Sequence, residues 1–159
     1  MANDINKSSS SFRSLVLLHR ALLAGQVVMG VMMYYLRSTS LNPPFNLELD
    51  RILQAVAIAL AAIAYLVGTK WFFTKKIKEA RESNGSTADK FAIYRTASLV
   101  QWALLEGTTL FAIVAFYLTG NLAFLVMAGM LVLIFALLMP SVMKIAILLR
   151  ASEQEIRDL

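Results

Sequence analysis

Four long apolar stretches, separated by short polar segments, make up most of the sequence. A helix needs about 20 mainly apolar residues to cross the hydrocarbon core of a bilayer. Stretches of this kind lie at residues 15–36, 52–73, 95–118 and 122–139. They predict an all-α fold, an integral membrane four-helix bundle with four transmembrane helices that forms a single transmembrane domain over residues 1–159.

The segments between the apolar stretches indicate how the helices are connected. Pro43-Pro44 predicts an extended or turned loop after the first helix. Residues 74–90 form a charged loop between the second and third helices. Thr119-Gly120-Asn121 is so short that the third and fourth helices must be antiparallel neighbours. Pro140 ends the fourth helix, and residues 140–159 are predicted to form an amphipathic helix with its basic side chains, Lys144 among them, toward water.

Basic residues predict the orientation. All of the 15 Lys and Arg residues except Arg37 and Arg51 fall on one side of an even-numbered topology. Because positive charge is enriched in cytoplasmic segments, both termini and the loop at 74–90 are expected in the cytoplasm, an N-in/C-in arrangement. The formal net charge of +5 is therefore attributed to membrane orientation, and the expected partner is the lipid bilayer rather than nucleic acid.

Composition excludes several kinds of site. The chain has no cysteine, which excludes disulfides and thiolate metal sites, and its single histidine, His19, cannot form a His-based metal cluster. No Gly-rich phosphate loop, metal-ligand cluster or nucleophile–base set occurs in the sequence. We therefore expect a protein that is not an enzyme and has no cofactor and no metal, and we interpret His19 as a hydrogen-bonded residue near the membrane interface.

Glu106 is the candidate ion-binding residue, because it lies near the middle of the third helix. An ionised carboxylate at that depth costs on the order of 2.5–3.5 kcal/mol by insertion scales, so Glu106 should be protonated, paired or next to a polar cavity. Candidate partners are Gln26 and Arg20 on the first helix and Thr109 on the same helix. Arg20 can alternatively extend to the interface. Both a functional and a structural role for Glu106 remain open.

Two segments carry a resemblance to a known family. The second helix contains Ala55-Val-Ala-Ile-Ala-Leu-Ala-Ala-Ile-Ala64, and the third contains Ala103-Leu-Leu-Glu106-Gly-Thr-Thr-Leu-Phe111-Ala-Ile-Val-Ala115. Together, over residues 52–118, they resemble the small-residue helix and the carboxylate-bearing helix of rotary ATP synthase c subunits, the proteolipids. The resemblance implies that Glu106 carries an ion by alternate protonation and release. The chain departs from the family in lacking its Arg-Gln-Pro-type loop motif and in having alanine where the family has glycine.

The chain as a whole is similar to small four-span membrane proteins of bacteria, which implies a multi-pass protein of the inner (plasma) membrane. Two functions follow from these observations. The first is a packing or accessory subunit of a membrane assembly, either a homo-oligomer or a larger membrane complex. The alternative is proton or cation translocation through Glu106. The absence of a catalytic set favours the first.

Overall fold

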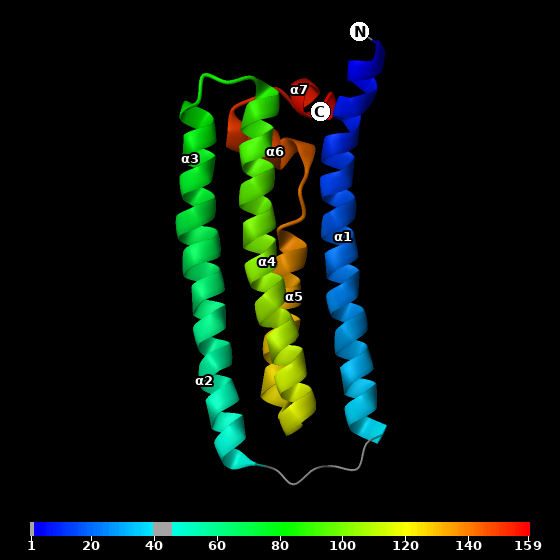
Figure 1. Ribbon diagram of the computed structural model, residues 1–159, viewed down its shortest axis with the longest axis vertical. Coiled ribbons are helices and arrows are strands. Elements are labelled where there is room, and N and C mark those ends of the chain that lie inside the picture. The colour runs from blue at the N-terminus through cyan, green and yellow to red at the C-terminus, as the bar shows by residue number, and fades with distance from the viewer. Residues whose placement is uncertain (1, 40–45) are drawn as a thin grey trace.

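The computed structural model describes residues 2–39 and 46–159, with side chains for 11–39 and 46–159. Every element in these ranges is a helix, as predicted. The helices are α1 (Ala2–Thr39), α2 (Leu47–Ile63), the π-helical η1 (Ala64–Phe73), α3 (Thr74–Glu82), α4 (Thr87–Thr119), α5 (Leu122–Leu137), α6 (Val142–Leu149) and α7 (Glu153–Arg157). α2, η1 and α3 follow one another without a break and form one long helix, called here the second helix (Figure 1). The loop predicted at Pro43-Pro44 lies outside the described residues.

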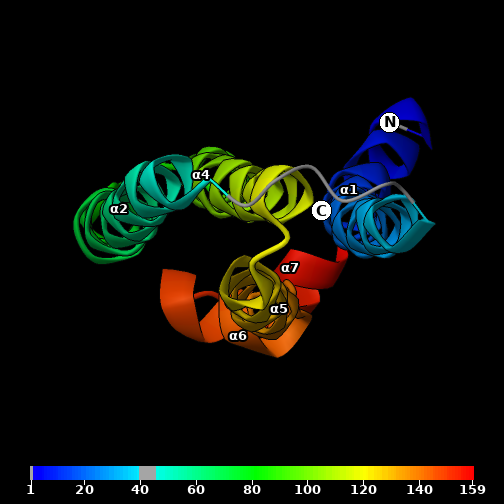
Figure 2. The ribbon, with the colours of Figure 1, turned by 90° about the horizontal axis from the view of Figure 1, so that it is seen from below.

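α4 is the central helix of the bundle. Seen along the helices, α4 lies between α1 and the second helix, and α5 covers one face of this row (Figure 2). In the most apolar 18-residue stretch of α4, 50% of the residues are buried inside the structure. The corresponding share is 17% in α1 and 17% in the second helix. Both ends of the chain and the turn between α3 and α4 lie at the same end of the bundle (Figure 1).

The prediction of four membrane spans is confirmed in part. Three helices are long and apolar enough to cross a membrane, namely Ser11–Thr39, Leu47–Glu82 and Thr87–Thr119. α5 and α6 qualify only together, and α6 is bent away from α5 by 73°. The described chain therefore contains three candidate spans, or four if this bent pair is one span.

The second helix approaches α4 along a line of small residues. Ala57 and Ala64 are buried against α4, and Gly68 follows them on the same face. A side-chain carbon added at Gly68 would lie 3.0 Å from Leu104 Cδ1, so the two helices are in close contact there. The other alanines of the 55–64 segment are exposed or half-buried. The predicted small-residue contact therefore involves one face of the helix and not the whole alanine run.

A polar cluster closes the end of the bundle opposite the termini. Asp50, only 4% exposed, accepts hydrogen bonds from Asn121 Nδ2 at 2.9 and 3.1 Å and from Gln54 Nε2 at 2.8 Å. Gly120, at φ 72°, forms the turn between α4 and α5, and a side-chain carbon added there would lie 2.5 Å from Arg37 Nη2. This turn therefore needs glycine both for its left-handed conformation and for the space that Arg37 occupies.

The tail differs from the single amphipathic helix predicted for residues 140–159. The structure has two short helices, because Arg150 adopts a left-handed conformation with φ 53° and ends α6. Ile145 and Leu149 of α6 and Ile156 of α7 are buried in one core cluster on either side of this reversal. The prediction of one helix is wrong because it did not include the chain reversal at Arg150, a residue other than glycine in the left-handed region.

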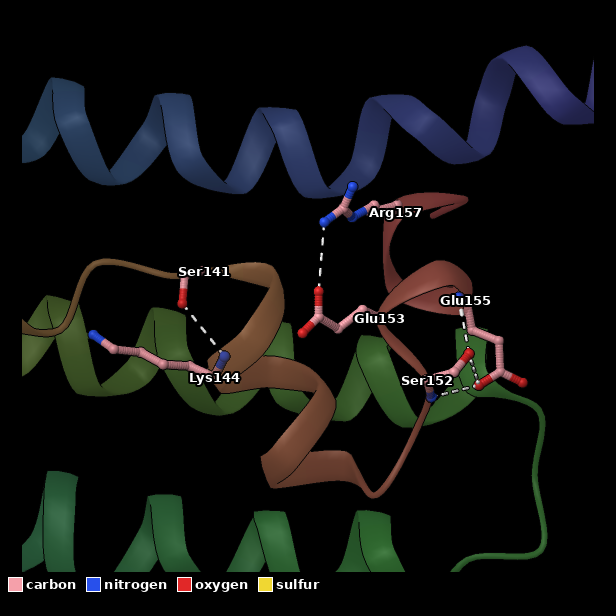
Figure 3. Close-up of polar contacts among 6 residues, drawn as sticks. All are labelled: Ser141, Lys144, Ser152, Glu153, Glu155 and Arg157. Carbon is pink, nitrogen blue, oxygen red and sulfur yellow. Dashed lines mark hydrogen bonds and ion pairs between the residues drawn. The ribbon is translucent and has the colours of Figure 1, made fainter.

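A reciprocal pair of hydrogen bonds begins α7 (Figure 3). Ser152 Oγ accepts from the Glu155 backbone N–H at 3.2 Å, and the Ser152 backbone N–H donates to Glu155 Oε2 at 2.8 Å. The backbone N–H and then the hydroxyl of Ser152 lower the pKa of the Glu155 carboxyl. Arg157 Nη2 lies 3.4 Å from Glu153 Oε2 one turn away. These contacts hold a five-residue helix that is too short to be stable alone.

Candidate functional site

Glu106 lies near the middle of α4 and is half-buried. It makes no hydrogen bond and no ion pair with any other described residue. Its neighbours Ala103 and Gly107 are exposed, so the carboxylate lies at the outer edge of the bundle rather than in its core. Within the described chain, Glu106 is therefore an unpaired acid on an otherwise apolar helix surface.

Two contacts fix the register between α1 and α4, which run in the same direction (Figure 1). The ring centres of His19 and Trp102 are 4.7 Å apart, and a side-chain carbon added at Gly30 would lie 3.7 Å from Ile113 Cδ1. The two contacts are separated by the same number of residues on each helix. Glu106 follows Trp102 by one turn and precedes Ile113 by two turns, so it lies on the α4 stripe that faces α1. By this register it is level with Leu23 of α1.

Glu106 therefore lies midway in depth between two of its candidate partners, Gln26 and Arg20. Each is three residues from Leu23, or about 4.5 Å along the axis. Gln26 is 1% exposed, and neither its side-chain nitrogen nor its oxygen has a partner. Arg20 is exposed and lines a shallow hollow with Phe12, Arg13, Val16 and Leu17, toward the start of α1.

The third candidate partner, Thr109, is fully buried and donates its hydroxyl to the Leu105 carbonyl at 2.8 Å. Its hydroxyl proton is thus used within α4. None of the three predicted partners bonds to Glu106 in the described structure. Of the three, Gln26 is the one whose side-chain polar atoms are all without a partner.

His19 is hydrogen-bonded, as inferred from the sequence, and its side chain lies in the core of the bundle. Its ring stacks on Phe135 at 4.6 Å and meets Trp102 edge-on at 4.7 Å, and the residue is 1% exposed. Its Nε2 lies 3.0 Å from the Phe135 carbonyl oxygen. Because a carbonyl only accepts, Nε2 must carry the proton, and the buried Nδ1 has no partner.

His19 and Gln26 lie on the same face of α1, two turns apart, with three buried polar atoms that have no protein partner. A buried polar atom without a partner costs about 1–3 kcal/mol, and most such atoms in folded proteins have one. These three atoms therefore remain available for a hydrogen bond to a further polar group. Glu106 lies at the outer edge of the contact between α1 and α4.

The break between α5 and α6 brings a second set of polar groups together. α5 ends at Leu137, which leaves carbonyl groups of its last turn without helical partners. His19 donates to the Phe135 carbonyl, and Lys144 Nζ donates to the carbonyls of Leu137 and Met139 at 3.1 and 3.4 Å. Figure 3 shows Lys144 in the first turn of α6, where Ser141 Oγ accepts from its backbone N–H at 3.3 Å.

A hollow of about 230 Å³ lies beside this break. It is lined by Phe73, Tyr94, Ser98, Gln101, Trp102, Leu137, Leu138, Met139, Lys144 and Leu148. Gln101 at its edge donates to Thr69 Oγ1 of η1 at 3.0 Å. The break at Pro140 and the exposure of Lys144 agree with the prediction, but sequence reasoning missed the bonds from Lys144 Nζ to the carbonyls at the end of α5.

Among the described residues, no group of three or more His, Cys, Asp or Glu side chains could hold a metal ion. Comparison of the chain with protein-family models, curated proteins and solved structures gives no match. The features that carry a functional argument are those of the chain itself, and the unpaired carboxylate of Glu106 is the most informative of them.

Proposed function

We propose that this chain is an integral membrane protein and acts as a packing or accessory subunit of a membrane assembly. α1, the second helix and α4 span the bilayer, and α5 with α6 forms a broken fourth span. Large apolar side chains such as Leu17, Leu66 and Leu133 are more than half exposed, which suits contact with lipid or with other helices. Basic residues concentrate at the end that holds both termini, and this supports an N-in/C-in orientation in the inner membrane of a bacterium.

The observation that carries this proposal is the unpaired, half-buried Glu106. A carboxylate at mid-depth in a bilayer is costly unless a polar group bonds to it. No other described residue does so. A donor on a neighbouring helix of another chain would satisfy the carboxylate, and hydrogen bonds of this kind between helices contribute about 1–2 kcal/mol. The partner is either a second copy of the chain or a different membrane subunit.

We expect Glu106→Leu to dissociate the assembly, whereas Glu106→Gln retains it because the amide keeps the size and hydrogen bonding of the acid. The measurement is native mass spectrometry of the full chain, extracted from membranes into lipid nanodiscs without detergent. Glu82→Leu is the matched control, because it removes an acid that is two-thirds exposed and lies outside the apolar part of its helix. A wild-type chain found as a single copy without any partner contradicts the proposal.

Proton or cation translocation through Glu106 is the second candidate. The unpartnered atoms of His19 and Gln26, next to Glu106 on the contact between α1 and α4, favour it because they can bind a polar species along this path. In liposomes with a pH-sensitive dye inside, this function predicts that Glu106→Gln abolishes proton flux while the assembly stays intact. Flux at the wild-type rate in Glu106→Gln excludes it.

A further inference from the structure

A groove lies between α3 and α6, and a hydrogen bond at its edge links the two helices. Arg81 Nε donates to the Leu148 carbonyl at 2.6 Å, which ties α3 to the last turn of α6. Next to this bond lies a hollow of about 300 Å³. It is lined by Phe73, Thr74, Ile77, Lys78, Arg81 and Leu148, and these residues are called the basic groove below. Apolar side chains provide its walls and two cations provide its charge.

The charge of the basic groove is of one sign. No acidic residue lines it, and the 230 Å³ hollow that shares Phe73 and Leu148 with it adds a third cation, Lys144. Glu82 is 3.8 Å from Lys78 Nζ, but both side chains are at least two-thirds exposed, so this pair neutralises little charge. Arg81 uses only its Nε for Leu148, which leaves two guanidinium nitrogens that can bind one oxyanion in the two-pronged manner typical of arginine.

Two neighbouring contacts indicate where the basic groove lies relative to the bilayer. Lys75 Nζ lies 5.4 Å from the centre of the Trp71 ring, and Lys70 Nζ lies 5.7 Å from that of Tyr65. Aromatic side chains next to lysines are typical of the membrane–water interface on the cytoplasmic side. The basic groove begins at Phe73, in the same turns of the second helix, and this places it at the level of lipid headgroups.

We propose that the basic groove binds one anionic phospholipid of the cytoplasmic leaflet. The phosphate lies between Lys78 and Arg81, and an acyl chain follows Phe73 and Leu148 toward the hydrocarbon. Basic pockets between helices at this side of a membrane commonly bind such headgroups. The inference rests on the membrane placement proposed above, but it does not depend on the assembly through Glu106.

Native mass spectrometry of the purified full chain in mild detergent tests this inference. We expect the wild-type chain to retain one phosphatidylglycerol in preference to phosphatidylcholine with the same acyl chains. Lys78→Gln combined with Arg81→Gln should weaken phosphatidylglycerol binding by about tenfold or more, because two contacts to the phosphate are lost. Arg81→Lys should weaken phosphatidylglycerol binding in part, since lysine keeps the positive charge but lacks the planar guanidinium group with its paired donors. Added inorganic phosphate should not displace the lipid.

Lys76→Gln is the matched control. It removes one positive charge from the same helix, but Lys76 does not line the basic groove and pairs with Glu79 at 2.8 Å. Equal weakening by Lys76→Gln and by Lys78→Gln would show general attraction of basic residues to the membrane and would overturn the site. Equal retention of the two lipids by the wild-type chain would also overturn it. Lys78→Gln alone keeps the test valid if changes at Arg81 disturb folding, because Lys78 is 75% exposed.

The outcomes separate this inference from the proposed function. A chain that is released from membranes by alkaline carbonate contradicts the membrane placement itself. A chain that stays in the membrane as a single copy but retains phosphatidylglycerol contradicts the assembly and supports the lipid site.

Discussion

Trp102→Ala will destabilise the bundle by about 3 kcal/mol or more, because large-to-small changes in a packed core lose contacts and leave a cavity. Trp102 is 1% exposed and is the largest of the fully buried side chains. It contacts His19 of α1 at 4.7 Å and Phe135 of α5 at 6.2 Å between ring centres. One substitution therefore weakens the contacts among three helices. Equilibrium unfolding in mixed micelles, followed by circular dichroism, measures the loss.

The chain offers its own control for this experiment, because it has only two tryptophans. Trp71 is 61% exposed, and Trp71→Ala should change the free energy of unfolding by about 0.5 kcal/mol or less. Each variant keeps a single tryptophan, so its fluorescence reports the environment of the one that remains. Similar losses in the two variants would mean that the contact among His19, Trp102 and Phe135 contributes little.

Asp50→Ala is expected to cost about 2–3 kcal/mol, since hydrogen bonds to a charged group contribute about 1.5–3 kcal/mol each and the donors lose their acceptor. The carboxylate of Asp50 joins the start of α2 to Asn121 in the turn between α4 and α5. Its loss should loosen this end of the bundle first. Hydrogen exchange should therefore increase at the backbone of residues 47–54 and 119–124 before it increases elsewhere.

Glu48→Ala is the control for Asp50, because it removes an exposed acid from the same first turn of α2. Both acids interact favourably with the helix N-terminus, an effect of about 0.3–1 kcal/mol. If Asp50→Ala lowers the free energy of unfolding more than Glu48→Ala does, the difference measures the hydrogen bonds to Asn121 and Gln54. If the two variants unfold at the same denaturant concentration, the cluster has no stabilising role.

The long helices were predictable because the signal is local. Apolar length defines a candidate span, and Thr119-Gly120-Asn121 allows only an antiparallel turn. The neighbours of Glu106 were harder to predict, because they depend on the register between α1 and α4. That register is determined by the packing of His19 on Trp102 and of Gly30 near Ile113. Depth counted along each helix separately does not give that register.

His19 and Asp50 show the same difference between local and distant causes. His19 is buried because its partner, the Phe135 carbonyl, lies near the break that ends α5, far away in the sequence. In the sequence, Asp50 resembles an ordinary acid in the first turn of a helix. Its hydrogen bond from Asn121, which is distant in the sequence, is what joins α2 to the turn between α4 and α5. In the tail, by contrast, a local signal existed: Ser152 and Glu155 have the spacing of a capping box, and this marks the start of α7.

The bend after α5 has a consequence for the shape of the bilayer around the protein. α5 has 16 residues, and a helix of that length rises about 24 Å, which is less than the roughly 30 Å of hydrocarbon. α1 and α4 are long enough to cross completely. In the membrane placement proposed above, α6 is too strongly bent to extend α5 across the bilayer, so the lipids beside α5 would shorten, with the exposed Met143 and Ile147 of α6 next to them. With this placement, we expect a protein with one short and several long spans to favour regions where the membrane is thin or curved.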